Sequence, residues 1–109
     1  MRSAIYALRN ASYACTVIKT FADKTTAALF SGRRVRRLPP DIQRRAYAKL
    51  QALTAADTLD FLRTPPSNRL QALSDDRAEQ WSIRINDQWR VCFRWHNGDA
   101  YEVEIVDYH

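Results

Sequence analysis

The chain has little of the chemistry from which metal sites and disulfide frameworks are built. It contains two cysteines, Cys15 and Cys92, and two histidines, His96 and His109, in 109 residues. Their positions follow no metal-ligand or redox spacing, so the sequence predicts no zinc site, no disulfide and no bound cofactor. We expect both thiols to be reduced in a cytoplasmic protein.

The first sixteen residues also lack acidic side chains and long apolar runs. The longest apolar run, Ala4 to Leu8, is too short for the core of a secretory signal or for a membrane span. The Arg, Ser and Ala content would also be compatible with an organellar transit peptide. We interpret residues 1–16 as an N-terminal tail and residues 17–109 as one domain, with no membrane partner.

The composition of the whole chain is that of a protein with a real core. Hydrophobic residues make up 46% and aromatic residues 11% of the sequence. By size scaling, a domain of this length buries roughly 65% of its unfolded surface. The chain is therefore long enough for one independently folded domain.

Apolar spacing predicts mainly helices in the first half of that domain. After a short strand over residues 17–21, a helix is expected to begin near Lys24, with Asp23 as its N-cap, and to stop at Gly32. A second helix is expected from Pro40, with apolar residues at a helical period: Ile42, Ala46, Leu50 and Leu53. After it, Thr54 resembles the cap of a short third helix that runs through Leu62 and ends before a Pro-rich loop.

Two stretches with strict alternation predict neighbouring strands in the second half. Residues 80–86 and 89–95 each place apolar side chains at every second position. A three-residue loop between them sets Ile83 opposite Val91, whereas a two-residue loop would set Ile85 opposite an arginine. The apolar face therefore favours the three-residue loop.

A further turn leads into the last strand. A three-residue turn at residues 97–99, with a glycine at its centre, would set Phe93 opposite Val103 and Arg94 opposite Glu102. A strict two-residue turn would set Phe93 opposite a glutamate instead. We therefore expect the three-residue turn here too.

The predicted register brings two arginines together. Arg84 and Arg90 become direct cross-strand neighbours, which costs roughly 0.2 to 1 kcal/mol when nothing neutralises them. Glu102 is expected beside Arg94, so the arginine pair has no obvious protein partner. A bound anion would remove the repulsion, and arginine suits phosphate oxygens; the alternative is that both side chains splay into water.

The last three residues are Asp107, Tyr108 and His109, at the end of an alternating, strand-like segment. A strand holds an acid, a phenol and an imidazole more firmly than a loose tail does, so this triplet could transfer protons. The alternative is an ordinary frayed terminus.

Charge is divided unevenly along the chain. Residues 1–54 contain eleven Lys and Arg against two acids, whereas residues 55–109 contain six Arg against ten acids. Such a basic half indicates a polyanionic partner, although a solvated helix face or a nuclear signal would give a similar run. The candidate nucleic-acid-binding residues lie within thirteen positions: Arg33, Arg34, Arg36, Arg37, Arg44 and Arg45.

Two blocks of the sequence resemble a known family. Residues 81–95 read WSIRINDQWRVCFRW and residues 97–109 read NGDAYEVEIVDYH. With VIKTF near the start and NRLQAL in the middle, these blocks are similar to the HigB branch of the RelE/ParE superfamily, the toxins of bacterial type II toxin-antitoxin systems. The resemblance covers about residues 17–109.

The resemblance implies an α+β, RelE-like fold, with N-terminal helices packed on a small antiparallel β-sheet. It implies ribosome-dependent cleavage of messenger RNA and a HigA-type helix-turn-helix antitoxin as partner. Arg90 matches the arginine that neutralises the scissile phosphate in the family. Asp107, Tyr108 and His109 match the terminal triplet that the family needs for cleavage.

The chain departs from the pattern of the family at three places. Gln71 and Ser74 stand where some members carry a histidine and a lysine, and a glutamine cannot act as a general base. Either His109 therefore does more here or the activity is weaker. Val17 stands where members start with methionine, which an over-extended start would explain.

We therefore expect a metal-independent endoribonuclease that uses a ribose 2′-hydroxyl as the nucleophile. Its site residues are predicted to be Arg90, Asp107, Tyr108, His109 and Gln71, and Arg84 is expected to join the other arginines in binding mRNA and ribosomal RNA. Two alternatives stay open: a non-enzymatic ParE-like inhibitor of DNA gyrase, and an RNA-binding module without catalysis. The terminal triplet favours the nuclease, because ParE-like toxins generally lack it.

Overall fold

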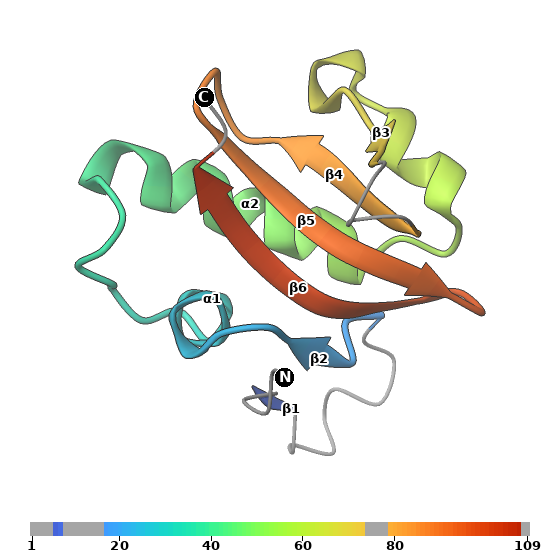
Figure 1. Cartoon of the computed structure of the whole chain (residues 1–109). Coiled ribbons are helices and arrows are strands. Elements are labelled where there is room, and N and C mark those ends of the chain that lie inside the picture. The colour runs from blue at the N-terminus through green and yellow to red at the C-terminus, as the bar shows by residue number, and fades with distance from the viewer. Residues whose placement is uncertain (1–5, 8–16, 74–78, 108–109) are drawn as a thin grey trace.

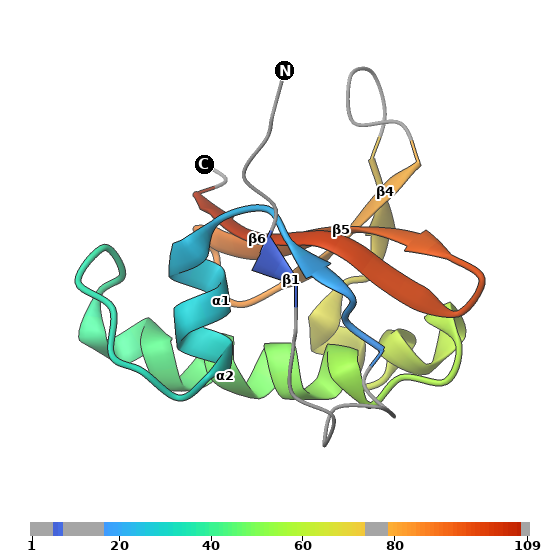
Figure 2. The same ribbon diagram turned by 90° about the horizontal axis from the view of Figure 1, so that it is seen from below.

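The computed structural model of the chain describes residues 6–7, 17–73 and 79–107, which form a sheet with helices on one face (Figures 1 and 2). The fold is therefore α+β, as predicted. Its helical elements are α1 (Lys24–Phe30), α2 (Pro40–Thr54) and the 3₁₀ helices η2 (Leu59–Arg63) and η3 (Pro66–Asn68). Its strands are β1 (Tyr6–Ala7), β2 (Thr20–Phe21), β3 (Gln71–Ala72), β4 (Gln80–Arg84), β5 (Trp89–His96) and β6 (Asp99–Asp107).

The sheet is mixed, so the expectation of a purely antiparallel sheet is wrong. The strands follow the order β1-β2-β6-β5-β4-β3, and Phe21 of β2 pairs in parallel with Val103 of β6. Parallel neighbours need a crossover connection, and the helices and strands between β2 and β6 provide one. Because α1 and α2 both follow β2, the helical layer is not N-terminal to the whole sheet.

The two α-helices begin where the sequence predicts. Asp23 caps α1, since its Oδ1 accepts a hydrogen bond from the backbone N–H of Thr26 at 3.0 Å. Gly32, with φ +91°, follows the end of this helix. The predicted apolar positions of α2 are all buried: Ile42, Ala46, Leu50 and Leu53.

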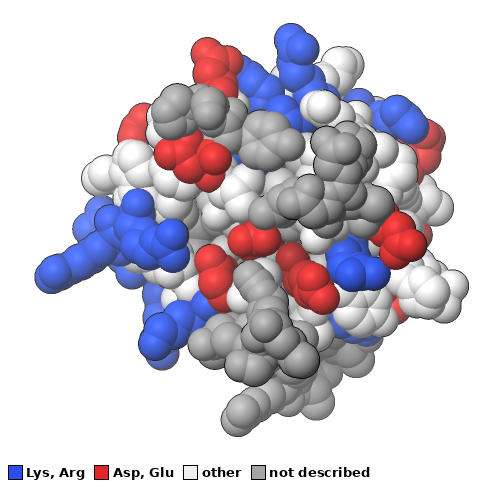
Figure 3. All heavy atoms as spheres, in the orientation of Figure 1, with Lys and Arg blue, Asp and Glu red and all other residues white. Residues whose placement is uncertain are grey.

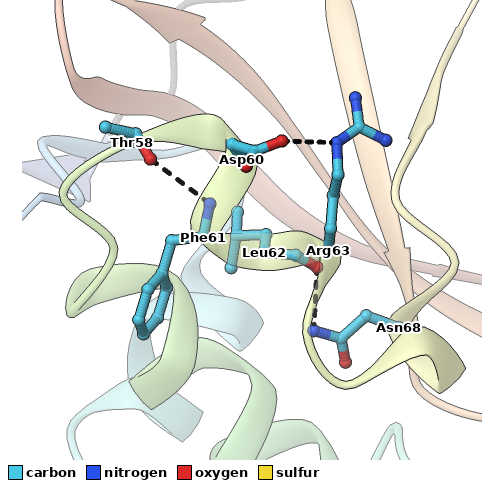
Figure 4. A network of polar contacts seen from close by, with 6 residues as sticks. All are labelled: Thr58, Asp60, Phe61, Leu62, Arg63 and Asn68. Carbon is cyan, nitrogen blue, oxygen red and sulfur yellow. Dashed lines mark hydrogen bonds and ion pairs between the residues drawn. The ribbon is translucent and has the colours of Figure 1, made fainter.

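The short third helix begins later than predicted. Thr54 is the last residue of α2, and the cap of η2 is Thr58, whose Oγ1 accepts from the N–H of Phe61 at 3.3 Å. Thr54 does not cap the third helix, because the apolar period of α2 continues through Leu53 and keeps Thr54 within α2. Figure 4 shows η2 and the cap at Thr58.

The first hairpin has the predicted register. Ile83 pairs with Val91 and Arg84 pairs with Arg90, and the N–H of Ile85 donates to the carbonyl of Trp89 at 2.9 Å. A three-residue loop thus joins β4 and β5, as the apolar alternation requires.

The second hairpin differs from the prediction. It turns through Asn97 and Gly98 alone, both at positive φ (51° and 81°), as a tight two-residue turn demands. A bulge at Glu102, with φ 53°, adds one residue to β6 and returns the apolar side chains to one face. Arg94 consequently pairs with Tyr101 and not with a glutamate.

The core lies between the helices and the sheet. Ile83, Val91, Phe93 and Val103 are fully buried there, together with the apolar side of α2. The described helices lie on this face of the sheet (Figure 2), and we call the opposite face, to which alternation along β5 assigns Arg90 and Arg94, the helix-free face. Within the described ranges, no helix is long and apolar enough to cross a membrane.

Candidate functional site

Arg90 lies on the helix-free face of the sheet, and its guanidinium is held in place. Its Nε donates to Ser82 Oγ at 2.9 Å, and its Nη2 donates to the backbone carbonyl of Arg69 at 2.9 Å. Ser82 is fully buried in β4, so its hydroxyl is a fixed acceptor. A charged fork positioned in this way can neutralise a phosphate without first having to be ordered.

Gln71 lies beside Arg90. It pairs with Ser82 across the β3–β4 ladder, and its exposed side chain accepts a hydrogen bond from Arg90 Nη2 at 3.3 Å. The fold therefore brings two of the predicted site residues together from positions nineteen apart in the sequence. Ser74 lies outside the described residues.

Arg84 is the cross-strand neighbour of Arg90, as predicted, but it does not lack a protein partner. It forms an ion pair with Asp87, within the loop that joins β4 and β5. Arg90 has its own partners in Ser82 and Arg69. The expectation that this arginine pair has no obvious protein partner is therefore wrong, because it overlooked the acid three residues along the chain from Arg84.

The terminal triplet is only partly described. Asp107 closes β6 opposite Trp89, and its Oδ2 accepts a hydrogen bond from Gln88 Nε2 at 3.1 Å. Arg90 pairs with the preceding residue of β6, so alternation places Asp107 and Arg90 on opposite faces. Tyr108 and His109 lie outside the described residues.

The arginines between the helices form an exposed loop, which we call the arginine loop: Arg33, Arg34, Arg36 and Arg37. Figure 3 shows cationic side chains gathered at the left edge, where Figure 1 places this loop between α1 and α2. A hollow of about 450 Å³ adjoins the loop and is lined by Leu29, Tyr47 and Arg44 among others. Arg44 and Arg45 follow on α2, and both are exposed.

Gln43 holds the arginine loop in shape, a role that the sequence did not suggest. Its Oε1 accepts from the N–H of Val35 at 3.0 Å, and its Nε2 donates to the carbonyls of Val35 at 2.6 Å and Leu38 at 2.9 Å. One amide thus satisfies three backbone groups of a loop with no regular structure. The only sequence signal is a polar residue beside the buried stripe of α2.

Lys49 is a second residue that the sequence analysis missed. Its ammonium donates to the side-chain oxygen of Asn68, which is fully buried. Figure 4 shows the Asn68 amide nitrogen turned toward the carbonyl of Leu62, to which it donates at 3.1 Å. Burial lowers the pKa of Lys49, and the positive charges of Arg45 and Arg84 lower it further.

Charge on the helix-free face is mixed and not uniformly basic. Figure 3 shows acidic side chains near the middle of this face and cationic side chains toward its left and upper edges. Arg94, whose predicted partner was Glu102, forms an ion pair with Glu79 at 3.1 Å instead. In this view most of the cationic side chains therefore lie toward the edges of the face.

Comparison with known proteins shows the family of the chain. Residues 19–109 match the family described as RelE-like toxin of type II toxin-antitoxin system HigB. The chain belongs to this family. This toxin is 36% identical over 81 residues to Toxin HigB-1 of Vibrio cholerae. The aligned residues make up 73% of the chain and 85% of the relative.

A second relative matches along its whole length. The toxin is 33% identical over 93 residues to Endoribonuclease HigB of Proteus vulgaris, which covers 85% of the chain and 100% of the relative. Membership of a type II toxin-antitoxin family implies an antitoxin as a partner of this toxin.

Proposed function

We propose that this toxin is an endoribonuclease that cuts messenger RNA in the decoding site of the ribosome. The observation that carries the proposal is the fixed guanidinium of Arg90, held by Ser82 and Arg69 on the helix-free face. The similarity to a relative named an endoribonuclease supports the same reaction class.

The proposed reaction is attack by a ribose 2′-hydroxyl on the adjacent phosphate. A bond forms from the 2′-oxygen to phosphorus, the bond to the 5′-oxygen breaks, and a cyclic phosphate remains. Arg90 neutralises the charge that develops on the phosphate. His109 serves as general acid or base, and Tyr108 positions the substrate or transfers a proton. The nucleophile is part of the substrate, so the scheme assigns no role to a metal ion.

Asp107 has a supporting role in this proposal. Its contact with Gln88 ties the end of β6 to the loop that precedes β5. The strand end from which Tyr108 and His109 continue is thereby held next to the strand that carries Arg90. We assign Gln71 to the same site because it contacts Arg90 and stands where a base would be useful.

The partners in this proposal are the ribosome with its mRNA and a HigA-type helix-turn-helix antitoxin, all in the cytoplasm. One histidine and one tyrosine form a modest catalytic set, so the ribosome is proposed to align the substrate. The exposed arginines of the arginine loop, Arg44 and Arg45 are proposed to bind ribosomal RNA.

A single experiment tests the proposal. Messenger RNA is incubated with the toxin in the presence and absence of ribosomes, and the new 5′ ends are mapped. We expect cuts only on ribosome-bound RNA, and we expect deletion of His109 to slow single-turnover cleavage about 10²-fold without loss of ribosome binding. Equal cleavage of naked RNA contradicts the ribosome dependence. Parental cleavage by the deletion variant contradicts the role of His109, and gyrase inhibition would then be tested.

A further inference from the structure

Four cationic side chains gather where α2, η3 and β4 meet. We call them the cation cluster: Arg45, Lys49, Arg69 and Arg84. The side chains of Lys49 and Arg69 have no role in the nuclease site described above, where Arg69 contributes only its backbone carbonyl. Arg45 and Lys49 lie on α2, Arg84 lies on β4 and Arg69 directly follows η3, so only the folded chain brings the four together.

Two members of the cation cluster lie on α2. Arg45 and Lys49 are one helical turn apart, on the same side of the helix. The ammonium of Lys49 is anchored on Asn68, and Arg69 is the next residue along the chain. Asn68 uses its amide nitrogen on the carbonyls of Leu62 and Thr64, at 3.1 and 3.4 Å, so its oxygen is directed to Lys49.

The contacts continue to the proposed cleavage site. Arg69 has φ +47°, a left-handed conformation, and its carbonyl accepts the hydrogen bond from Arg90 Nη2. Arg84 lies directly opposite Arg90 in the β4–β5 ladder. The cation cluster is therefore adjacent to the guanidinium proposed to hold the scissile phosphate.

The cluster holds more positive than negative charge. Among the described residues, its one ion pair joins Arg84 to Asp87, a side chain that is 97% exposed. Arg84, Arg69 and Arg45 all lower the pKa of that carboxylate, the hydrogen bond from Arg84 most strongly. Within the part of the chain that the structure describes, one of the four cations is in an ion pair, and its carboxylate lies on the solvent side, where an incoming anion can take its place.

We propose that the cation cluster binds a backbone phosphate of the RNA, next to the phosphate held at Arg90. This inference rests on the proposed nuclease function and adds a subsite to it. Phosphate oxygens accept hydrogen bonds from both guanidinium and ammonium groups, and the buried Asn68 fixes the ammonium before the RNA arrives. A phosphate bound here would hold the neighbouring nucleotide and so fix the position of the cleaved bond.

The test uses a 2′-O-methyl RNA oligonucleotide, which has no free hydroxyl to attack, and measures its affinity for the full chain over a salt series. Lys49→Gln and Arg84→Gln should each reduce the slope of log K against log salt by about 0.7, the value for one lost phosphate contact on a single strand. Arg63→Gln is the matched control, because Arg63 is exposed and pairs with Asp60 on η2. It should leave the slope unchanged.

A second kind of variant is expected to gain RNA binding, and it leaves the contact between Lys49 and Asn68 in place. Asp87→Asn removes the competing carboxylate and should tighten RNA binding several-fold. Slopes and affinities equal to those of Arg63→Gln in all cluster variants would overturn the proposal. Competition by inorganic phosphate at matched ionic strength forms a second arm, and a cluster that binds free phosphate but leaves RNA affinity unchanged would also overturn it.

These outcomes are separable from failure of the nuclease function. A parental toxin that binds RNA with the predicted slopes but cuts no ribosome-bound mRNA contradicts the catalytic assignment alone. A toxin that cuts mRNA normally while every cluster variant binds like the control contradicts the phosphate subsite alone.

Discussion

Arg90 combines a fixed position with a charged, planar guanidinium. Two of its nitrogens are occupied by Ser82 and by the Arg69 carbonyl, both at 2.9 Å, and its contact with Gln71 is longer, at 3.3 Å. A guanidinium has five N–H donors in a rigid fork, which matches the oxygens of a phosphate. A lysine could supply the charge but not the fork.

This difference gives the first residue-scale prediction. Arg90→Lys should lower single-turnover cleavage of ribosome-bound mRNA, and Arg90→Ala should lower it by about 10²-fold or more, as loss of a preorganised charge does. Arg94→Lys is the control, since Arg94 lies on the same strand but pairs with exposed Glu79. Equal rates for the two lysine variants would contradict the role of Arg90.

Gln71 gives the second residue-scale prediction, because it contacts Arg90 but cannot exchange a proton. In a toxin that lacks His109, Gln71→His should restore part of the lost cleavage, since general acid-base catalysis contributes about 10² to 10⁴-fold. The restored rate should rise with pH as the new imidazole loses its proton. Gln71→Asn in the same background is the control, and an equal rate for both variants would place Gln71 outside the reaction.

Among the secondary-structure elements, those fixed by local pattern were predictable. The β4–β5 register follows from apolar alternation, and the limits of α1 and α2 follow from Asp23, Gly32 and Pro40. The bulge at Glu102 was not predictable, because a non-glycine residue at φ 53° leaves no signal in the sequence. The parallel pairing of β2 with β6 was missed because it joins segments about eighty residues apart.

In the candidate site too, features set by local pattern were predictable and contacts between distant segments were not. Arg84 and Arg90 are cross-strand neighbours, as the register predicts. The partner of Arg84 is an acid in the loop after β4, and those of Arg90 include a serine on β4 and the backbone carbonyl of the residue after η3. The role of Lys49 depends on a buried asparagine nineteen residues away. Contacts of this kind are set by how the elements pack, and periodicity along one element contains no information about them.

The cap of α1 gives a prediction at the scale of the element. This helix has only seven residues, so the hydrogen bond from Thr26 to Asp23 is a large part of what fixes its start. Asp23→Ala should lower the free energy of unfolding by about 0.5 to 2 kcal/mol in urea denaturation. Asp23→Asn keeps an oxygen acceptor and should stay close to the parental value; equal losses in both variants would mean that charge, and not capping, stabilises the helix.

At the scale of the whole molecule, the fold brings the basic residues 1–54 and the acidic residues 55–109 together in one domain. The basic first half supplies the arginine loop and α2, which lie beside the strands of the acidic second half. Acidic side chains occupy the middle of the helix-free face, and cations lie toward its edges (Figure 3). The charge on this face therefore favours contact of RNA with its edges over contact with its middle.

The arginine loop allows its shape to be tested separately from its charge, because Gln43 holds the loop through three hydrogen bonds and has no charge itself. Replacing Arg33, Arg34, Arg36 and Arg37 with Gln should weaken ribosome association and flatten its salt dependence, since fewer counterions are released. Gln43→Ala should weaken association several-fold and leave the salt slope unchanged, because the same phosphate contacts form from a loop that must first be ordered. Gln51→Ala, at an exposed position of the same helix, is the control. Unchanged association in the four-arginine variant would show that the loop is only a solvated surface, whereas a reduced slope in Gln43→Ala would mean that this glutamine sets how many phosphates the loop reaches.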